Sequence, residues 1–522
     1  MKETSVWLQN KIILPVIISS GIFLRLWHLG SHSFWCDEFL AISLGRLSLT
    51  EMARWVFRND AHPPLFYGIV HFLMKTGQSE AALRSVSAIS GILSLLVFYL
   101  FLKRFWKGNI FLPLALFALS PAAVLWSQIL KSYSLLTLFS LLSTYSFFVF
   151  RQTKKPFSGV AWFLTTTPLL YLHNYGVLIF AAEIISALLP GFSFSRKIWL
   201  PFATVIFLSY LPYFAGPIFS QIYLARNATR SVTSPILRMM YVFYYFVFGE
   251  TLHFFNFKFT LPGSILFGFF FFRGLLETKM EAVKLFSVVL IAMGLLMVFI
   301  IPLTIPQNLV HLQPFFFLVI ASGINNIAKR PYRIGLSVLL PLVFLPSLYY
   351  YYRGDTLQYH DVSKLVPYRQ ISREIEEKGR PGEVVIFTGD SREQRFVQFF
   401  PPYSGWDWYY RGGLPLKEIN PAVINDLTGT LTEITANYQG FWLLLRYSAN
   451  REWNEKIKSF FVKLEQEGKM VQRTEKKMVR NDSFLARLRG KPEPQYYFLE
   501  VYHFRSTISN YLQKKAESAT IR

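Results

Sequence analysis

The chain has 522 residues, of which 52% are hydrophobic, 18% aromatic and only 16% charged. A soluble protein carries about 25% charged residues, and here the deficit lies in long uncharged runs, which indicates a membrane protein. The formal net charge of +23 resides largely in short basic clusters between those runs, a positive-inside pattern that argues against nucleic-acid binding. The single cysteine, Cys36, excludes an intramolecular disulfide and a multi-cysteine metal site.

Eleven apolar stretches approach the length of about twenty residues that a helix needs to cross a bilayer. They lie at 11–29, 85–102, 109–126, 133–150, 157–173, 175–192, 197–217, 258–273, 283–302, 309–328 and 333–352. The basic clusters between them share one side only if the N-terminus is cytoplasmic and the count is eleven. The first stretch lacks a small-x-small cleavage site after it, so we interpret it as a retained helix and not as a signal peptide.

This topology predicts a transmembrane domain over 1–352, with a first outer loop at 30–83 and a long outer loop at 218–257. The apolar, aromatic segment 236–256 is ambiguous, because a further crossing there would move every later basic cluster outside. We therefore expect it to be an interfacial or re-entrant element with its aromatic rings at the headgroup level.

Residues 353–522 have the composition of a soluble domain, which the topology places outside the cytoplasm. Strands are predicted at Glu383–Phe387, Gly440–Leu445 and Tyr496–Phe504. Helices are predicted at 367–378 and at Glu452–Gln466, the second stopped by Gly468. The fold class expected from the sequence is a polytopic α-helical membrane protein with a C-terminal extracytoplasmic α/β domain, which we assign to substrate or partner contact.

The first outer loop contains two adjacent carboxylates, Asp37 and Glu38, directly after the first membrane helix. Such a pair is costly beside lipid and suits a catalyst whose substrate has one end in lipid and one in water. The structural alternative is a solvated loop start in which Glu38 caps a helix.

Two short helices are predicted further along this loop. The first opens with a capping box, Ser48-Leu49-Thr50-Glu51, and we expect its apolar face to lie on the membrane surface; that face is formed by Met52, Trp55 and Val56. The second helix begins at Pro64, and the consecutive prolines Pro63 and Pro64 stiffen the turn and hold His62, a candidate substrate contact, in place. Alternatively, His62 is a turn residue that hydrogen-bonds to the backbone.

Sugar transfer from a polyprenyl phosphate needs a base or a metal for the acceptor hydroxyl, and cations or dipoles for the leaving phosphate. Asp37 is predicted to be the base. Glu38 is predicted to orient the acceptor, and the pair is compatible with a divalent metal without requiring one. The candidate donor contacts are Arg84, Lys131, Arg226, Arg230, His173 and His311. Arg84 alternatively pairs with Glu80 one turn back, and Lys131 alternatively snorkels to the interface.

Five short motifs, in chain order, resemble those of the bacterial relatives of protein O-mannosyltransferases, in glycosyltransferase family 39 and related membrane glycosyltransferases of the type C fold. The family patterns are W-x-D-E, H-P-P-L-Y-Y, L-R-L-x-S, S-P … S-Q-E-x-R-x-Y-S-L and Y-T-H-Y-Y-G. The matching residues are Trp35–Glu38, His62–Tyr67, Leu83–Ser87, Ser120-Pro121 with Ser127-Gln128 and Tyr133–Leu135, and Tyr171–Gly176.

The resemblance implies a type C fold, an inverting enzyme with a polyprenyl- or dolichyl-phosphate-sugar donor, and Asp37 with Glu38 as the catalytic acid pair. It adds three residues to the candidate substrate-binding set: Gln128, Tyr133 and Tyr175. The chain also departs from the motifs. It has Ile129 and Lys131 where the family has Glu and Arg, and a lysine holds phosphate without the bidentate fork of an arginine. The later family arginine is also missing, in Asn308–Pro314.

The sequence thus predicts a glycosyltransferase of the inner cell membrane that acts at the outer face. The acceptor remains open among glycan, lipid and protein, and the sugar is not determined. Two other classes compete with this hypothesis. A lipid-linked sugar transporter would place charged residues near the bilayer midplane in paired repeats, and a non-catalytic scaffold of an envelope-assembly complex would not need the acid pair.

Overall fold

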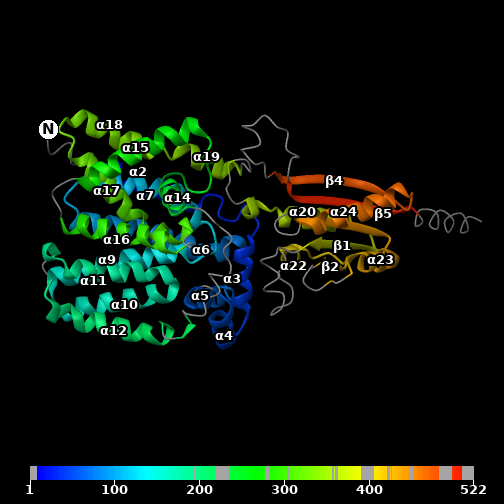
Figure 1. Cartoon of the computed structure of the whole chain (residues 1–522), viewed down its shortest axis with the longest axis horizontal. Coiled ribbons are helices and arrows are strands. Elements are labelled where there is room, and N and C mark those ends of the chain that lie inside the picture. The colour runs from blue at the N-terminus through cyan, green and yellow to red at the C-terminus, as the bar shows by residue number, and fades with distance from the viewer. Residues whose placement is uncertain are drawn as a thin grey trace, which may run out of the picture. The chain divides into compact units, whose positions relative to one another are not determined.

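The computed structural model of the chain (Figure 1) describes residues 9–60, 62–192, 194–214, 216–217, 234–276, 281–301, 305–354, 358, 362–388, 405–419, 424, 426–446, 451–480 and 497–507. The chain divides into two compact units. The first comprises Met1–Ser31 and Ala41–Gly354, and the second comprises His32–Leu40 and Asp355–Arg522. The sequence predicts a division after residue 352; it does not predict that residues 32–40 group with the C-terminal part.

The first unit is helical. Its elements are η1 (Gln9–Ile13), α2 (Leu14–Leu26), α4 (Leu49–Asn59), α5 (Leu65–Leu73), α6 (Glu80–Phe105), α7 (Phe111–Leu119), α8 (Pro121–Ser127), α9 (Tyr133–Thr153), α10 (Pro156–Leu172), η2 (Asn174–Gly176), α11 (Val177–Leu188), η3 (Pro190–Phe192), α12 (Arg196–Phe214), α14 (Pro235–Phe248), α15 (Phe257–Leu276), α16 (Ala282–Ile300), η4 (Pro306–Leu312), α17 (Gln313–Asn325), α18 (Arg330–Leu342) and α19 (Leu345–Arg353). Helix α3 (Cys36–Arg46) begins in the second unit and continues into the first.

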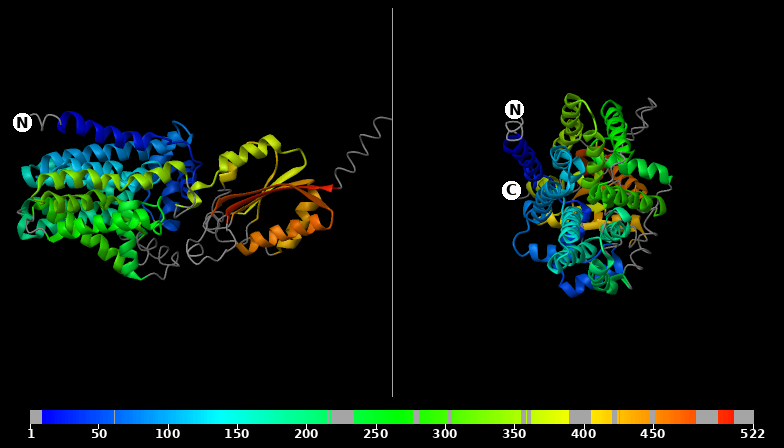
Figure 2. Two further views of the ribbon diagram at one scale, coloured as in Figure 1. Left: turned by 90° about the horizontal axis from the view of Figure 1, so that it is seen from above. Right: turned by 90° about the vertical axis from the view of Figure 1, so that its left-hand side faces the viewer.

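Each of the eleven predicted apolar stretches carries helix, and the long helices lie side by side (Figures 1 and 2). Within the described residues, seven helical segments are long and apolar enough to cross a membrane. They are α6, α9, α12, α15, α16, η4 with α17, and α18 with α19. The remaining stretches carry shorter helices, so the protein is a multi-pass membrane protein for which the count of eleven stays a prediction.

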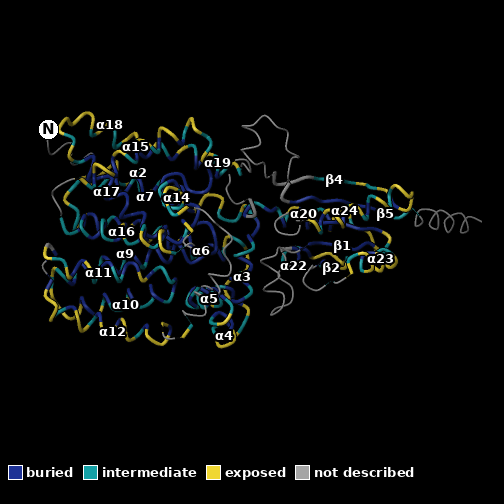
Figure 3. The backbone as a smooth tube through the Cα atoms, viewed as in Figure 1, coloured by how far each residue is buried: buried dark blue, intermediate teal, exposed yellow. Residues whose placement is uncertain are grey.

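Helix α17 is buried along almost its whole length, whereas α12, α15 and α18 each expose several large apolar side chains (Figure 3). Exposed apolar surface on this scale is what lipid contact requires. The central position of α17 matters for the site, because η4 leads directly into it.

The stretch 109–126 is two helices and not one continuous span. Ser120 ends α7 and its Oγ accepts a hydrogen bond from the Ala123 N–H at 3.2 Å, while Pro121 opens α8. The carbonyls left open at the end of α7 are satisfied by Arg25 of α2, which is fully buried and donates to Ala118 O at 2.9 Å and to Phe117 O at 3.3 Å. The sequence did not indicate this role for Arg25.

Segment 236–256 contains α14, a helix of 14 residues. This is about 21 Å long and shorter than the hydrocarbon thickness of about 30 Å. Since α2 and α11 are shorter still, the prediction that the segment does not cross stays a prediction. The helix ends at Gly249, whose φ of +64° suits glycine, and a Cβ there would lie 3.1 Å from the Ala122 nitrogen. The long-loop arginines Arg226 and Arg230 lie outside the described residues.

The capping box at the start of α4 is confirmed, with Ser48 Oγ accepting from Glu51 N–H and Glu51 Oε2 accepting from Ser48 N–H. The expectation that the apolar face of α4 lies on the membrane surface is wrong. Met52, Trp55 and Val56 are buried in the protein. The amphipathic pattern predicted the helix and its apolar face, but a buried packing partner satisfies that face as well as lipid does.

The second unit contains a five-stranded mixed sheet in the order β2-β1-β3-β5-β4. The strands are β1 (Glu383–Thr388), β2 (Leu416–Ile419), β3 (Gly440–Arg446), β4 (Met470–Arg480) and β5 (Tyr497–Ser506), and the helices are η5 (Val362–Leu365), α20 (Tyr368–Lys378), α22 (Gly405–Tyr409), α23 (Leu427–Asn437) and α24 (Arg451–Gln466). β1 pairs in parallel with β2 and β3, whereas β5 pairs antiparallel with β3 and β4. The α/β class and the predicted elements are confirmed; β2, β4 and α23 were not predicted.

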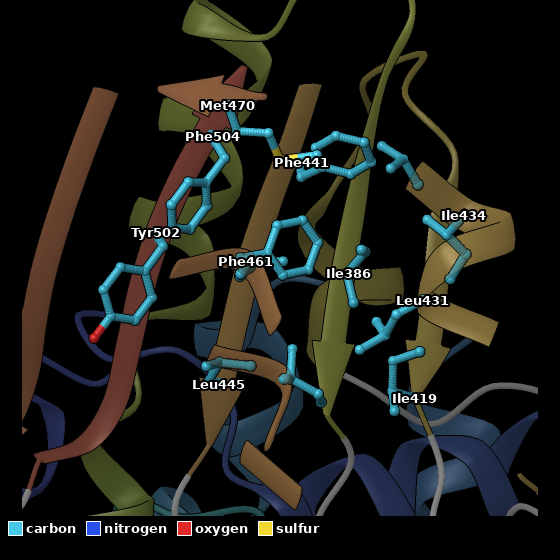
Figure 4. Packing of buried hydrophobic residues seen from close by; sticks show 13 residues of the cluster. Ile386, Ile419, Leu431, Ile434, Phe441, Leu445, Phe461, Met470, Tyr502 and Phe504 are labelled. Carbon is cyan, nitrogen blue, oxygen red and sulfur yellow. The ribbon is translucent and has the colours of Figure 1, made fainter. Parts of the chain in front are cut away.

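Helices α23 and α24 cover one face of this sheet and α20 the other (Figure 2). The first interface is the apolar core shown in Figure 4, where Ile386 and Phe441 of the sheet pack with Leu431 of α23 and Phe461 of α24. Gly468, at φ +69°, follows the end of α24 as predicted.

A buried polar group lies within this sheet. The carboxylate of Glu383 accepts hydrogen bonds from Arg505 Nε (2.7 Å), Trp442 Nε1 (3.0 Å) and Arg380 N (3.2 Å), and lies 3.2 Å from His503 Nε2. Burial alone would raise the pKa of Glu383, but these partners outweigh it and lower the pKa from the usual 4.5 to about 2.

We predict that Glu383→Gln destabilises this unit by about 3 kcal/mol at neutral pH, because it leaves Arg505 and His503 without their buried anion. A pKa that is lower in the folded state gives stability above the unfolded value, which is lost as pH falls. The difference from wild type should therefore shrink as pH falls from 4.5 towards 2. Thermal unfolding of the purified full chain across this pH range measures it.

The matched control is Glu452→Gln on α24, which removes an exposed carboxylate paired with Lys456 and should leave unfolding unchanged. Equal unfolding temperatures for the two variants would contradict the role assigned to Glu383.

Candidate functional site

The two acids of the first outer loop occupy the first turn of α3, where the helix dipole favours negative charge. They differ in environment. Glu38 is 1% exposed and its Oε2 accepts a hydrogen bond from the Trp35 N–H at 2.8 Å, so it caps the helix, as the structural alternative expected. Asp37 is half-buried and lies beside Cys36, with 3.7 Å between the Cys36 Sγ and Asp37 Oδ1. Asp37 is therefore the more accessible carboxylate of the pair.

A second acid, Asp60, lies in the first unit at the end of α4. It is buried, 3.0 Å from His62 Nδ1, and its other oxygen accepts a hydrogen bond from the Tyr67 hydroxyl. Burial alone would raise the pKa of Asp60, but His62, Tyr67 and the charge of Lys131 outweigh it and hold the pKa below its usual value. Asp60 is thus ionised at neutral pH and only accepts, so His62 Nδ1 carries the hydrogen.

Two further imidazoles lie next to this pair. The His62 and His173 ring centroids are 5.0 Å apart. His173 Nδ1 accepts a hydrogen bond from the Tyr175 N–H at 3.2 Å, so Nε2 carries its hydrogen. That Nε2 is buried without a hydrogen-bond partner in the described part of the chain. His311 is also fully buried, with backbone groups of Asn308 and Tyr175 within reach of its ring. Buried donors of this kind are normally paired, so the group can accept an oxygen-rich ligand.

Lys131 lies in the short connection between α8 and α9, is only 8% exposed, and is close enough to contribute its charge to both Asp60 and His173. A snorkelling lysine would expose its ammonium, so this alternative is wrong. We call Asp60, His62, Lys131, His173 and His311 the charged cluster.

The rings of Tyr133 and Trp126, which we call the aromatic wall, lie next to the charged cluster. Tyr133, at the start of α9, is 5.6 Å from the His173 ring and 4.4 Å from the Trp126 ring, measured between centroids. Its hydroxyl donates to Asn308 Oδ1 at 3.2 Å. Trp126 Nε1 donates to the Tyr245 hydroxyl, which lies 3.5 Å from an oxygen of the buried Glu250. Aromatic faces with amides and carboxylates are suited to binding a sugar, which has apolar faces and a polar edge.

Two predicted substrate contacts, Arg84 and Gln128, form hydrogen bonds to backbone carbonyls outside the charged cluster. Arg84 is 4% exposed and donates to Leu29 O at 3.3 Å. The Gln128 amide donates to the carbonyls of Leu24 and Trp27, both at 2.7 Å, and its oxygen accepts from the Tyr351 hydroxyl at 2.6 Å. These bonds tie α2, α8 and α19 together, which gives Gln128 a structural function.

The structure therefore brings together six predicted residues, His62, Lys131, Tyr133, His173, Tyr175 and His311, from four chain connections that the topology places on one side of the membrane. It groups Asp37 and Glu38 with the second unit. No set of three or more His, Cys, Asp or Glu suited to a metal ion occurs within the described residues. A metal at Asp37 and Glu38 would need substrate or water oxygens to complete its coordination, and one Glu38 oxygen already caps α3.

The sequence analysis missed five members of this region: Asp60, Trp126, Tyr245, Glu250 and Asn308. Only Asp60 carried a usable signal, because it lies two residues before His62. Tyr245 belonged to a segment whose rings were assigned to the headgroup level; it is fully buried in protein, and that placement stays a prediction.

No protein-family model matches the chain, and no curated protein matches it in sequence. Its structure is similar to that of ArnT from Cupriavidus metallidurans in the apo state, with a TM-score of 0.54, 12% identity, and coverage of 94% of this chain and 97% of ArnT. ArnT bound to undecaprenyl phosphate gives a TM-score of 0.52, 13% identity and the same coverage. AglB from Archaeoglobus fulgidus, in complex with an inhibitory peptide and a dolichol-phosphate, gives 0.46 at 14% identity over 84% of this chain and 70% of AglB.

At this identity the similarity to ArnT concerns the fold alone. It confirms the type C fold expected from the motifs. ArnT belongs to glycosyltransferase family 83 and not to family 39, so the resemblance holds at the level of the fold and not of the family. The chain is a multi-pass membrane protein with the fold of the type C membrane glycosyltransferases.

Proposed function

We propose that the protein transfers a sugar from a polyprenyl-phosphate-linked donor to an acceptor at the outer face of the cell membrane. The observation that carries this proposal is the charged cluster, set within a type C fold that aligns with ArnT over 94% of the chain. In the cluster, His62 and Lys131 lie close to the carboxylate of Asp60, His173 packs against His62, and the Nε2 of His173 is buried without a partner among the described residues. Such a group offers an ammonium and an imidazole N–H that suit a phosphate.

In this proposal Asp37 is the general base. Its carboxylate takes the proton of the acceptor hydroxyl while the acceptor oxygen attacks the anomeric carbon. The bond from that carbon to the phosphate oxygen breaks, its electrons stay on the phosphate, and Lys131 with the imidazole N–H groups stabilises the added charge. The aromatic wall of Tyr133 and Trp126 would hold the sugar.

The first experiment identifies the reaction. Mass spectrometry of envelope glycans and lipids from cells with and without the gene should show one missing sugar, which names the donor and the acceptor together. An unchanged glycan and lipid profile would favour a scaffold, and accumulation of a lipid-linked sugar inside the cell would favour a transporter.

We predict that Asp37→Asn lowers the rate of sugar transfer at least about 100-fold, because the amide cannot take the proton. Donor binding and the folded state should be unaffected. Turnover by the purified protein in lipid vesicles measures the rate, and donor binding at equilibrium serves as the companion measurement. Full activity of Asp37→Asn would exclude it as the base.

Two further variants, of Glu38 and of His62, test whether another group acts as the base. Glu38→Gln should keep most activity, since the amide oxygen still accepts the cap hydrogen bond from Trp35. His62→Gln tests the pair of His62 with Asp60. If its loss of activity is as large as that of Asp37→Asn, this pair and not Asp37 would be assigned as the base.

We predict that Lys131→Met raises the KM for the donor about tenfold or more, because a buried charge-assisted contact to phosphate is lost. The rate at saturating donor should change less. Lys75→Met provides the control, since Lys75 lies in the first outer loop, which also carries Asp60 and His62, but is exposed. Equal donor KM values for the two variants would argue against phosphate binding at the charged cluster.

A further inference from the structure

Residues 32–40 follow α2 of the membrane unit and include the first turn of α3, yet they group with the C-terminal domain. We propose that this domain positions the carboxylate of Asp37 through a set of aromatic contacts, which we call the aromatic anchor. The aromatic anchor consists of Phe34, Trp35 and Phe39 on the segment and Tyr368, Trp408 and Tyr409 on the domain. The inference rests on the proposed function, in which Asp37 is the base.

Two hydrogen bonds hold the segment just before Asp37, one through the backbone of Phe34 and one through the side chain of Ser33. The Phe34 N–H donates to the Tyr409 hydroxyl at 2.8 Å, and the Arg369 N–H donates to Ser33 Oγ at 3.1 Å. Tyr409 ends α22 and Arg369 lies in the first turn of α20. Two separate helices of the domain therefore hold adjacent residues of the segment.

Ring packing holds the segment on both sides of Asp37. Before it, the Phe34 ring lies 5.8 Å from Trp408 and 6.4 Å from Tyr409, between centroids. After it, Phe39 lies edge-on to Tyr368 at 5.8 Å and to Tyr409 at 6.2 Å. Phe34 and Phe39 are 1% and 4% exposed, so neither ring can shift without losing these contacts.

Trp35 joins the aromatic anchor to the first turn of α3. Its ring is covered by Lys364, whose Nζ lies 4.6 Å from the ring centroid. The backbone N–H of Trp35 donates a hydrogen bond to Glu38 Oε2. Because the turn from Trp35 to Glu38 is closed in this way, the backbone that carries Asp37 follows the position of Trp35. Phe34, Trp35 and Tyr409 are thus positioning residues, and the domain that sequence analysis assigned to substrate or partner contact also supports the chemistry.

The inference predicts different effects on kcat and on the donor KM. The residues proposed to hold the donor phosphate belong to the first unit, whereas the anchor belongs to the second. Loosening the anchor should therefore lower kcat through misplacement of Asp37 and leave the donor KM unchanged. A misplacement of about 1 Å can cost up to about 100-fold in rate, so a loss of about tenfold is expected from a partial loosening.

The test uses Cys36, the only cysteine of the chain, as a reporter next to Asp37. In the full-length protein in vesicles, Tyr409→Phe removes the acceptor of the Phe34 N–H and keeps the ring, and Trp408→Ala removes a ring of the anchor. Both variants should lower kcat about tenfold, keep the donor KM within about twofold, and speed the reaction of Cys36 with a maleimide. Ser33→Ala, which removes the other acceptor, is the milder variant if Trp408→Ala does not fold.

Tyr438→Phe is the matched control, since Tyr438 packs against the core of the same domain and should change neither kcat nor Cys36 reactivity. Unchanged kcat in Tyr409→Phe and Ser33→Ala would overturn the inference, whether or not Cys36 reacts faster. Failure of the proposed function gives a different result, because the wild-type protein would then transfer no sugar, or Asp37→Asn would be fully active.

Discussion

The pairing of Asp60 with His62 and Lys131 is the interaction on which the site of the membrane unit depends. A carboxylate or an ammonium that is buried alone costs several kcal/mol, so each of these groups is tolerable only because the others are present. Asp60 stays ionised, which fixes the tautomer of His62 and holds its ring against His173. The charged cluster is therefore preorganised, and the unpartnered Nε2 of His173 leaves it one buried donor for a ligand.

This arrangement is built from interruptions of the helices. Residues inside a membrane helix have their backbone groups satisfied, whereas a helix end leaves polar groups to be paired. Lys131 lies between α8 and α9, His173 between α10 and η2, and His311 in the 3-10 turn before α17. Gly249 allows α14 to end against α8, close to the aromatic wall. The polar side chains thus meet where the backbone itself needs polar surroundings.

The first unit supplies the groups that would bind the donor phosphate, and the second holds the segment with Asp37 through Phe34 and Tyr409. Glu38, adjacent in sequence to Asp37, serves as the helix cap. In the proposed mechanism, the domain that holds Asp37 makes its own stability, including that of the Glu383 network, a condition for sugar transfer.

The sequence by itself determined the helices, the α/β class of the C-terminal domain and the capping box at Ser48, because hydrophobic runs, alternation and local hydrogen bonds act over a few residues. It also singled out Lys131, His173 and His311 at predicted helix ends. Only the tertiary structure decided which of them meet, that Arg25 closes α7, and that α4 is covered by protein and not by lipid. Glu250 and Tyr245 gave no local signal, since their role depends on Trp126, more than a hundred residues away. Contacts between distant residues follow from packing, which no short window of sequence encodes.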